Sequence, residues 1–206
     1  MTKLFYAPGA CSLGIHVLLE EIGKPYELSK MSLRDGDQRK PEFAAVNPKG
    51  KVPTLQRDDG SVLTEFPAIA VWLARTNPQA KLLPDDIETQ ARVTEALAFV
   101  VATIHMQGFS RLFGPGNFAP SEADHPAVLA RGREIAEKGL ALIDKALAGK
   151  DYIAGSFSIA DAALFYVETW AGGKGVTLPA NCAAHLARMK ARPAVQRALQ
   201  QEGLAA

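Results

Sequence analysis

The sequence predicts a small α/β domain followed by an all-helical domain. Before about residue 77, short runs rich in β-branched and aromatic residues alternate with helical patterns, whereas from Ile87 onward almost every apolar residue recurs with helical spacing. A chain of 206 residues can bury a core in each of two such domains. We place the boundary near residues 77–86 and expect domains at 1–80 and 87–206.

The N-terminal part is predicted to contain, in order, a strand, a helix, a second strand, a short helix or loop, a hairpin and a third helix. Pro8 and Gly9 end the first strand, and Gly23 ends the helix that follows, since glycine readily adopts the left-handed conformation of a helix end. An Asp-Gly turn joins the two hairpin strands, and Pro67 is tolerated in the first turn of the last helix. The expected ranges are 3–7, 12–22, 26–33, 41–46, 51–64 and 65–76.

The C-terminal part is predicted to be a set of helices. A long helix begins near Ile87 and carries an apolar stripe, a second helix covers about 127–148, and two shorter helices end the chain. Ser158 and Asp161 have the spacing of a capping box before another apolar helix, which is a folding signal. The stripe consists of Val93, Leu97, Val100, Val101 and Ile104.

Composition and charge argue against several classes of protein. With 23 basic and 22 acidic residues, the net charge of +1 favours neither a nucleic-acid partner nor a membrane surface. No stretch approaches the roughly 20 apolar residues that span a bilayer, and the first residues lack the apolar run of a signal peptide. The 2 cysteines lie far apart in sequence, which is typical of reduced thiols. We therefore expect a cytoplasmic protein, with no nucleic acid and no membrane as partners.

The first candidate for chemistry is Cys11, which stands just before a predicted helix start. The positive end of the helix dipole favours a thiolate there, and the alternative is a small apolar side chain packed under the helix. Gly14 takes the place of the second cysteine of a Cys-x-x-Cys redox pair. His16 is the other ligand type nearby, and two ligands do not make a metal site. Ser12 is either a helix cap or a hydroxyl aimed at a bound thiol.

A second candidate site combines the segments "NPKGKVPTL" and "LTEFPAI". Proline cannot donate to a sheet, and a cis Val52–Pro53 bond would turn the Val52 backbone toward a peptide-like ligand. Glu65 precedes a helix whose first N–H groups can bind a carboxylate, while its own carboxylate can bind an ammonium. These groups suit a zwitterionic α-amino acid, whereas Glu65 alone is explained equally well as an acidic residue that complements the helix dipole.

The remaining candidates lie on the long helix. His105 stands beside the apolar stripe, where a lone histidine is more often structural than catalytic. The apolar residues that follow form either the wall of an apolar pocket or a helix end packed in the core. They are Phe109, Leu112 and Phe113.

In sequence order, "YAPGACS", "NPKGKVPTL", "DDGSVLTE" and "FSIADAALF" resemble the cytosolic glutathione S-transferases, and the resemblance spans essentially the whole chain. The Pro-Gly-x-Cys-Ser start is similar to the bacterial beta class. The resemblance implies a thioredoxin-like N-terminal domain, an all-helical C-terminal domain and a homodimer. Cys11 and Cys182 would lie in different domains, so we expect no disulfide between them and a structural role for Cys182.

The resemblance also implies residue roles at a glutathione site. Cys11 would face the glutathione sulfur and could form a mixed disulfide with it. The backbone of Val52, held by a cis Pro53, would pair with the cysteinyl unit. Glu65 would bind the γ-glutamyl ammonium, and the backbone N–H of Phe66 would bind the neighbouring carboxylate.

The activity implied is conjugation of glutathione, as co-substrate, to a small apolar electrophile. Cys11, Ser12 and His105 are the expected catalytic groups, and His105 matches the beta-class histidine near the sulfur. No bound prosthetic group and no metal are expected. The same site could carry out glutathione-dependent thiol–disulfide exchange through Cys11, and the alternative is a non-catalytic binding or interaction protein with this fold. The expected electrophile pocket lies between the domains and is lined by Phe109, Leu112 and Phe113.

Overall fold

The structure, a computed structural model, describes residues 1–204 and divides the chain into two compact units. One unit contains Met1–Leu83 together with the segment that begins at Lys190, and the other contains Pro84–Met189. The division after Leu83 falls within the expected interval of 77–86. The segment from Lys190 groups with the N-terminal unit, whereas the sequence assigned it to the helical domain, because its helix packs against the first helix of the chain.

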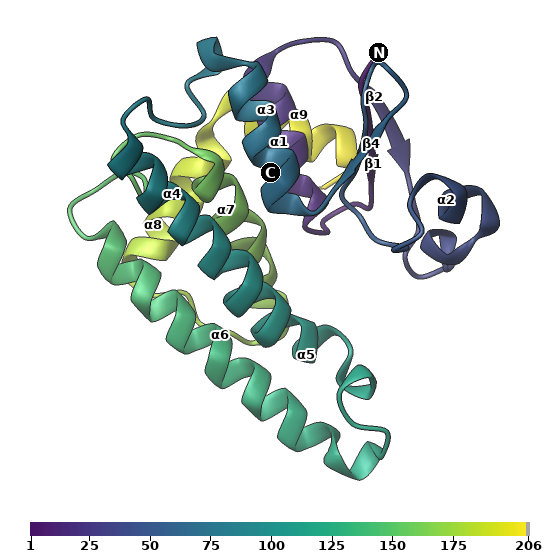
Figure 1. The fold of residues 1–206 in the computed structure, drawn as a ribbon. Helices are drawn as coiled ribbons and strands as arrows, with labels where there is room; N and C mark the ends of the chain where they lie inside the picture. The colour runs from purple at the N-terminus through teal and green to yellow at the C-terminus, as the bar shows by residue number, and fades with distance from the viewer. Residues whose placement is uncertain (205–206) are drawn as a thin grey trace. The chain divides into compact units, whose positions relative to one another are not determined.

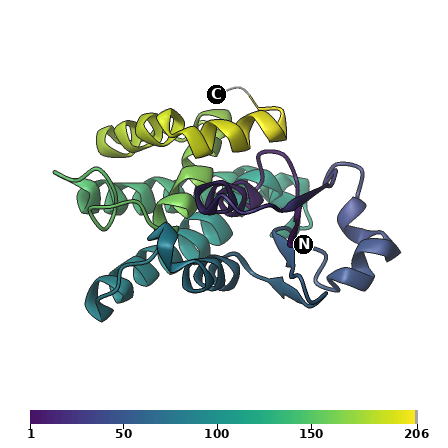
Figure 2. The same ribbon diagram turned by 90° about the horizontal axis from the view of Figure 1, so that it is seen from above.

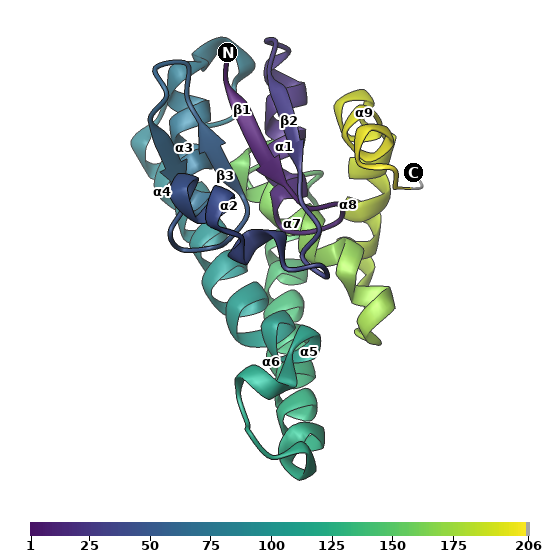
Figure 3. The same ribbon diagram turned by 90° about the vertical axis from the view of Figure 1, so that its right-hand side faces the viewer.

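The N-terminal unit is a four-stranded sheet with helices on both faces (Figure 1). The strand order is β2–β1–β3–β4; β1 and β2 run parallel, as Figure 3 shows, and the other pairs are antiparallel. Leu4 of β1 pairs with Leu28 of β2 on one side and with Leu55 of β3 on the other, so three leucines lie next to one another in the middle of the sheet. The strands are β1 (Lys3–Tyr6), β2 (Glu27–Lys30), β3 (Thr54–Gln56) and β4 (Val62–Thr64).

Four helices complete this unit: α1 (Ser12–Ile22), α2 (Pro41–Val46), α3 (Phe66–Thr76) and α9 (Pro193–Glu202). α1 and α3 cover one face of the sheet and α2 lies on the other (Figure 1). α1 is buried without interruption over its first eight residues, because β1, α3 and α9 surround it; Figure 2 shows α9 running beside it. As predicted, α1 ends at Gly23, with a φ of 71°, and α3 carries a proline in its first turn. The strand expected at 26–33 is confined to Glu27–Lys30.

The second unit consists of helices and turns. A continuous helix runs from Ile87 to Phe113 and packs against two others (Figure 1). Its middle is π-helical, which the apolar spacing does not predict. A Cβ on Gly139 would lie 2.6 Å from Ile104 Cγ1, so this glycine allows the close approach of two helices. The elements are α4 (Ile87–Phe99), the π-helical segment (Val100–Phe109), α5 (Ser110–Phe113), α6 (His125–Leu147), α7 (Ile159–Ala171) and α8 (Ala180–Ala191).

The helix Ile87–Phe113 is long and apolar enough to cross a membrane, with a mean hydropathy of 1.3, and within residues 1–204 it alone meets that test. This corrects the expectation that no stretch approaches such a length. Its fully buried side chains face α6 and α7, as in the core helix of a globular unit. They are Val93, Leu97, Val100, Ile104 and Phe109, whereas Val101 of the predicted stripe is half-buried.

Three buried ionisable side chains join α7 to α8. Asp161 completes the predicted capping box, accepting from the N–H and the hydroxyl of Ser158 at 2.8 Å each. His185 Nδ1 lies 2.9 Å from Glu168 Oε2, and its Nε2 lies 3.3 Å from Asp161 Oδ1. Burial raises the pKa of Glu168 to about 7, against the effect of the His185 hydrogen bond. Burial opposes the charge of His185, but its interactions with the Asp161 and Glu168 carboxylates outweigh it and raise its pKa to about 9.

We expect the stability of the protein to fall as the pH rises from about 6 to about 10. Both pKa values exceed the ordinary 4.5 and 6.5, so the folded state binds more protons than the unfolded chain across this window. The His185 contribution is complete below 6.5 and is lost as the pH passes about 9. Urea midpoints measured along this range should therefore decline. His185→Gln keeps a donor but does not titrate, and its midpoints should decline less; equal slopes for both proteins would refute this assignment.

Candidate functional site

The loop from Ala7 to Cys11 joins β1 to α1 and is closed by Ser12. The Ser12 hydroxyl donates to Ala7 O and accepts from Ala7 N, at 3.2 Å in each case, and the side chain is fully buried. The sequence left Ser12 as a helix cap or as a donor to a bound thiol. In the structure its hydroxyl hydrogen is committed to Ala7 O, so donation to a ligand would require that bond to break.

A residue of α9 also holds this loop by a hydrogen bond. Glu202 Oε2 accepts from the Gly9 N–H at 2.8 Å, and Glu202 Oε1 lies 2.9 Å from His16 Nδ1. Both side chains are 0% exposed. The other ring nitrogen of His16 lies 2.6 Å from Gln201 Oε1, so a core partner, rather than a metal, explains His16. Sequence reasoning did not identify Glu202, because Glu202 and His16 lie 186 positions apart and no local pattern links them.

Cys11 is partly exposed, and its thiol donates to Val52 O at 3.3 Å. Burial raises the pKa of Cys11 to about 12, while the backbone N–H groups of Cys11 and Ser12 act in the opposite direction. A helix start favours a thiolate, and its N–H groups are present, but in this structure loss of water around the sulfur outweighs them and favours the thiol. Cys11 is a hydrogen-bond donor here.

The second cysteine has no part in this site. Cys182 is fully buried in the other unit, and its thiol donates to Leu140 O at 3.6 Å. Both cysteines are free thiols in the structure.

The Val52–Pro53 peptide bond is cis, as expected. The turn before it is held by Asn47, which is buried; its Nδ2 donates to Lys51 O at 2.9 Å and to Thr54 Oγ1 at 2.8 Å. Sequence reasoning did not single out Asn47. An asparagine before a Pro-Lys-Gly turn is the signal that could have identified it, because such side chains readily bond nearby backbone groups.

Glu65 stands at the head of α3 with a φ of 70°, a left-handed conformation that is uncommon for a residue other than glycine. Its side chain is 61% exposed, and its carboxylate accepts from the Lys49 ammonium at 2.8 Å. Phe66 begins the helix with its own side chain buried. An exposed carboxylate beside a helix start, already holding one ammonium, can bind the charged end of an amino acid.

The other predicted residues lie in the second unit and gather around Trp170. His105 Nδ1 lies 3.2 Å from the Tyr166 hydroxyl, and the His105 ring meets Trp170 edge-on with 4.9 Å between centroids. Phe109 and Phe113 have centroids 5.5 Å and 5.0 Å from that of Trp170. The structure thus brings together the residues predicted at 105, 109 and 113, and adds Tyr166 and Trp170 from α7. These two were missed because they belong to a helix interpreted only as core.

The three apolar pocket candidates differ in exposure. Phe109 is 0% exposed and Leu112 is buried, so both are core residues in this structure. Phe113 is 50% exposed, and the Lys174 ammonium lies 4.4 Å from its ring centroid. Of the three, Phe113 alone presents a large apolar surface that a ligand can contact. Within residues 1–204, no cluster of three or more His, Cys, Asp or Glu side chains suits a metal ion.

We expect Cys11 to react slowly with iodoacetamide at pH 7, because the thiolate is the reactive form and burial raises the pKa to about 12. The labelling rate, followed by mass spectrometry, should rise about tenfold per pH unit up to about pH 10 without a plateau. Cys11→Ser supplies the blank, and the buried Cys182 should remain unmodified in the native protein. A plateau below pH 8 would show that the thiolate is stabilised after all.

Family models confirm the resemblance seen in the sequence. The model of the glutathione S-transferase N-terminal domain matches residues 9–76, and that of the C-terminal domain matches residues 126–200. Glutathione S-transferase GstA of Escherichia coli O157:H7 is 41% identical to this chain, over 98% of this chain and 99% of its own length.

Solved structures give the same result. A Sphingomonad glutathione S-transferase complexed with glutathione is 38% identical, with a TM-score of 0.85, and the match covers 98% of this chain and 100% of that one. A bacterial beta class glutathione S-transferase from Sphingomonas chungbukensis is 35% identical, with a TM-score of 0.83 and the same coverage. The chain belongs to the glutathione S-transferase family of enzymes, and its structural relatives include the bacterial beta class.

Proposed function

We propose that the protein conjugates glutathione to small apolar electrophiles, with glutathione bound along Cys11, Val52 and Glu65. The observation that carries this proposal is the Glu65–Lys49 contact, in which the exposed carboxylate at the head of α3 holds an ammonium at 2.8 Å. The γ-glutamyl end of glutathione offers the same ammonium, beside a carboxylate that suits the N-terminus of α3 at Phe66. A relative of this chain is solved with glutathione bound, which supports the same ligand here.

The central part of glutathione is a cysteinyl unit with its own peptide groups. Its N–H can donate to Val52 O, beside the cis Pro53. That carbonyl accepts from the Cys11 thiol at 3.3 Å in the structure, so a ligand N–H would compete with Cys11 for it. A Cys11 thiol released from Val52 O can donate instead to the sulfur of glutathione. Binding of the ligand would in this way supply the donor that stabilises the ligand's thiolate.

In the conjugation step, the glutathione thiolate attacks the electrophilic carbon, the C–S bond forms, and a leaving group such as halide departs. Cys11 keeps its proton and remains unchanged. Thiol–disulfide exchange would require Cys11 itself as the thiolate, and burial disfavours that form. The raised pKa of Cys11 therefore supports conjugation as the proposed main activity, with exchange as a minor one.

For the electrophile, we propose that the apolar surface of Phe113 and the edge-stacked ring of His105 form the binding wall. One ring nitrogen of His105 lies within hydrogen-bond distance of the Tyr166 hydroxyl. Besides forming part of the wall, His105 would orient a leaving group or stabilise the sulfur of glutathione. Phe109 and Leu112 would support this wall from the core. We also propose a cytoplasmic homodimer, as is usual for the family.

The role of Glu65 predicts weaker glutathione binding when its charge is removed. Glu65→Gln should raise the Kd measured by calorimetry about tenfold, as expected for the loss of one charge-assisted hydrogen bond. Glu137→Gln is the matched control, since Glu137 is an exposed carboxylate on α6 and should leave the Kd unchanged. If Glu65→Gln binds glutathione as tightly as the wild type, the proposed orientation of the ligand is wrong.

The role of Cys11 predicts a split between two activities. The wild type should conjugate glutathione to an activated aryl halide, and Cys11→Ala should retain substantial conjugation, about a tenth or more of the rate, because one weak donor is lost. The same variant should lose all glutathione-dependent reduction of a small mixed disulfide, since no other thiol can attack. Circular dichroism checks the fold. Equal loss of both activities would make Cys11 essential to conjugation, and a wild type that binds glutathione without turnover would support the non-catalytic alternative.

A further inference from the structure

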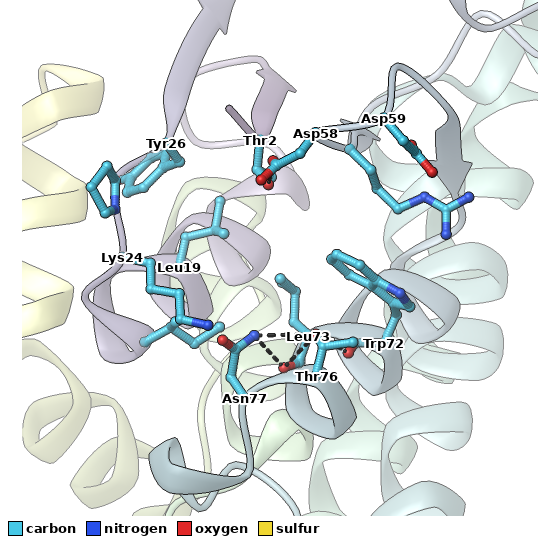
Figure 4. Close-up of a pocket in the computed structure, with 13 residues that line it drawn as sticks. Thr2, Leu19, Lys24, Tyr26, Asp58, Asp59, Trp72, Leu73, Thr76 and Asn77 are labelled. Atoms are coloured by element: carbon cyan, nitrogen blue, oxygen red, sulfur yellow. Dashed lines mark hydrogen bonds between the residues drawn. The ribbon is translucent and has the colours of Figure 1, made fainter.

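The N-terminal unit holds a pocket of about 360 Å³ at the amino end of β1 (Figure 4). Its walls come from Thr2, the turn between α1 and β2, the β3–β4 turn and the last turns of α3. β1 starts at this pocket and ends at the loop that carries Cys11, so the pocket and the thiol lie at opposite ends of the strand. The volume is that of a small-molecule site. No residue of the proposed glutathione site lines it.

A buried acceptor in this pocket lacks a donor. Asn77 is 5% exposed, and its Nδ2 donates to Leu73 O at 2.9 Å and to Thr76 Oγ1 at 3.2 Å. Its Oδ1 has no hydrogen-bond partner in the part of the chain that the structure describes. The two Nδ2 bonds fix the amide, and Figure 4 shows its oxygen on the arm that faces away from these two bonds. Because a buried unpaired carbonyl is costly, a ligand N–H or O–H is favoured at this point.

A buried donor in the same pocket lacks an acceptor. Arg57 Nε has no hydrogen-bond partner among residues 1–204. Neither the Arg57 guanidinium nor the Lys24 ammonium forms an ion pair within those residues. The two carboxylates that line the pocket are already engaged: Asp58 accepts from Thr2 Oγ1 at 2.6 Å, and Asp59 from Ser61 N at 2.9 Å. The lining thus carries two cations and two carboxylates, and Arg57, which also interacts electrostatically with Asp59, keeps an unpaired Nε–H that a carboxylate oxygen of a ligand can accept.

Aromatic side chains flank the space between these atoms. Tyr26 stands on one side and Trp72 on the other, with Asn77 between them at the base (Figure 4). The Arg57 guanidinium carbon lies 5.7 Å from the Trp72 ring centroid, so the cation is held at the aromatic wall. Aromatic side chains on two sides of a pocket suit a flat ring.

We propose that this pocket is a second small-molecule site, which takes a planar aromatic acid carrying an N–H or O–H donor. The donor binds Asn77 Oδ1, the anionic group binds Arg57 with Lys24 nearby, and the ring lies between Tyr26 and Trp72. One ligand of this kind satisfies both unpaired atoms at once. The site is independent of glutathione binding.

The test uses 4-hydroxybenzoate, which combines a carboxylate, a ring and an O–H donor, titrated into the full-length protein saturated with glutathione. We expect one saturable site with a Kd on the order of 0.1–1 mM by calorimetry. Benzoate, which lacks the donor, should bind about fivefold more weakly, and tyramine, whose ammonium replaces the carboxylate, should not bind.

Variants assign the contacts. Arg57→Gln and Asn77→Leu should each weaken 4-hydroxybenzoate binding about fivefold or more, and Asn77→Leu should leave benzoate binding unchanged, because that probe has no donor to lose. Lys145→Gln removes an exposed cation of α6 and should change nothing. Arg57 is on a turn, so its variant keeps the proposal testable if Asn77→Leu does not fold.

Several results would overturn the proposal. One is the absence of saturable binding up to about 10 mM probe, and another is equal affinity for benzoate and 4-hydroxybenzoate. If Arg57→Gln leaves the affinity for 4-hydroxybenzoate unchanged, Arg57 does not bind the carboxylate of the probe. If glutathione displaces the probe, the probe binds at the proposed glutathione site and not in this pocket.

Discussion

The Glu202 carboxylate lies where α9, α1 and the loop before Cys11 meet, and none of its surface is exposed. One oxygen accepts from the Gly9 N–H and the other lies 2.9 Å from a His16 ring nitrogen. A buried carboxylate without such donors would be strongly unfavourable, so its partners and its burial depend on one another. The position of the Cys11 loop is therefore coupled to the docking of α9, and the chemistry of the N-terminal unit depends on its last helix.

Burial also decides what Cys11 can do. A helix start favours a thiolate, but the sulfur is surrounded closely enough that its pKa rises to about 12, and the thiol donates to Val52 O. A protonated thiol can stabilise the sulfur of another molecule without reacting with it. In the proposed reaction glutathione is therefore the nucleophile and the protein supplies donors, and Glu65 is proposed to hold the distant end of the same ligand.

The buried polar groups at the two ends of β1 differ in whether their hydrogen bonds are satisfied. Ser12 and Asn47 have their hydrogen bonds satisfied inside the chain, and they shape the loops around Cys11 and Val52. At the opposite end of the sheet, Asn77 and Arg57 each keep one buried atom that has no partner among residues 1–204. Satisfied groups fix a loop, whereas unsatisfied groups in a pocket indicate a ligand, and this contrast separates a structural polar cluster from a candidate site.

The sequence alone determined the order of elements, because the signals involved are local: Gly23 ends α1, an Asp-Gly pair turns the hairpin, and Ser158 with Asp161 begins α7. The resemblance carried by the same segments predicted Cys11 and Glu65 as glutathione contacts. The tertiary structure decided the rest. The pKa of Cys11, the bond from Glu202 to Gly9 and the unpaired oxygen of Asn77 all follow from how distant segments pack, and desolvation depends on that packing and not on neighbours in sequence.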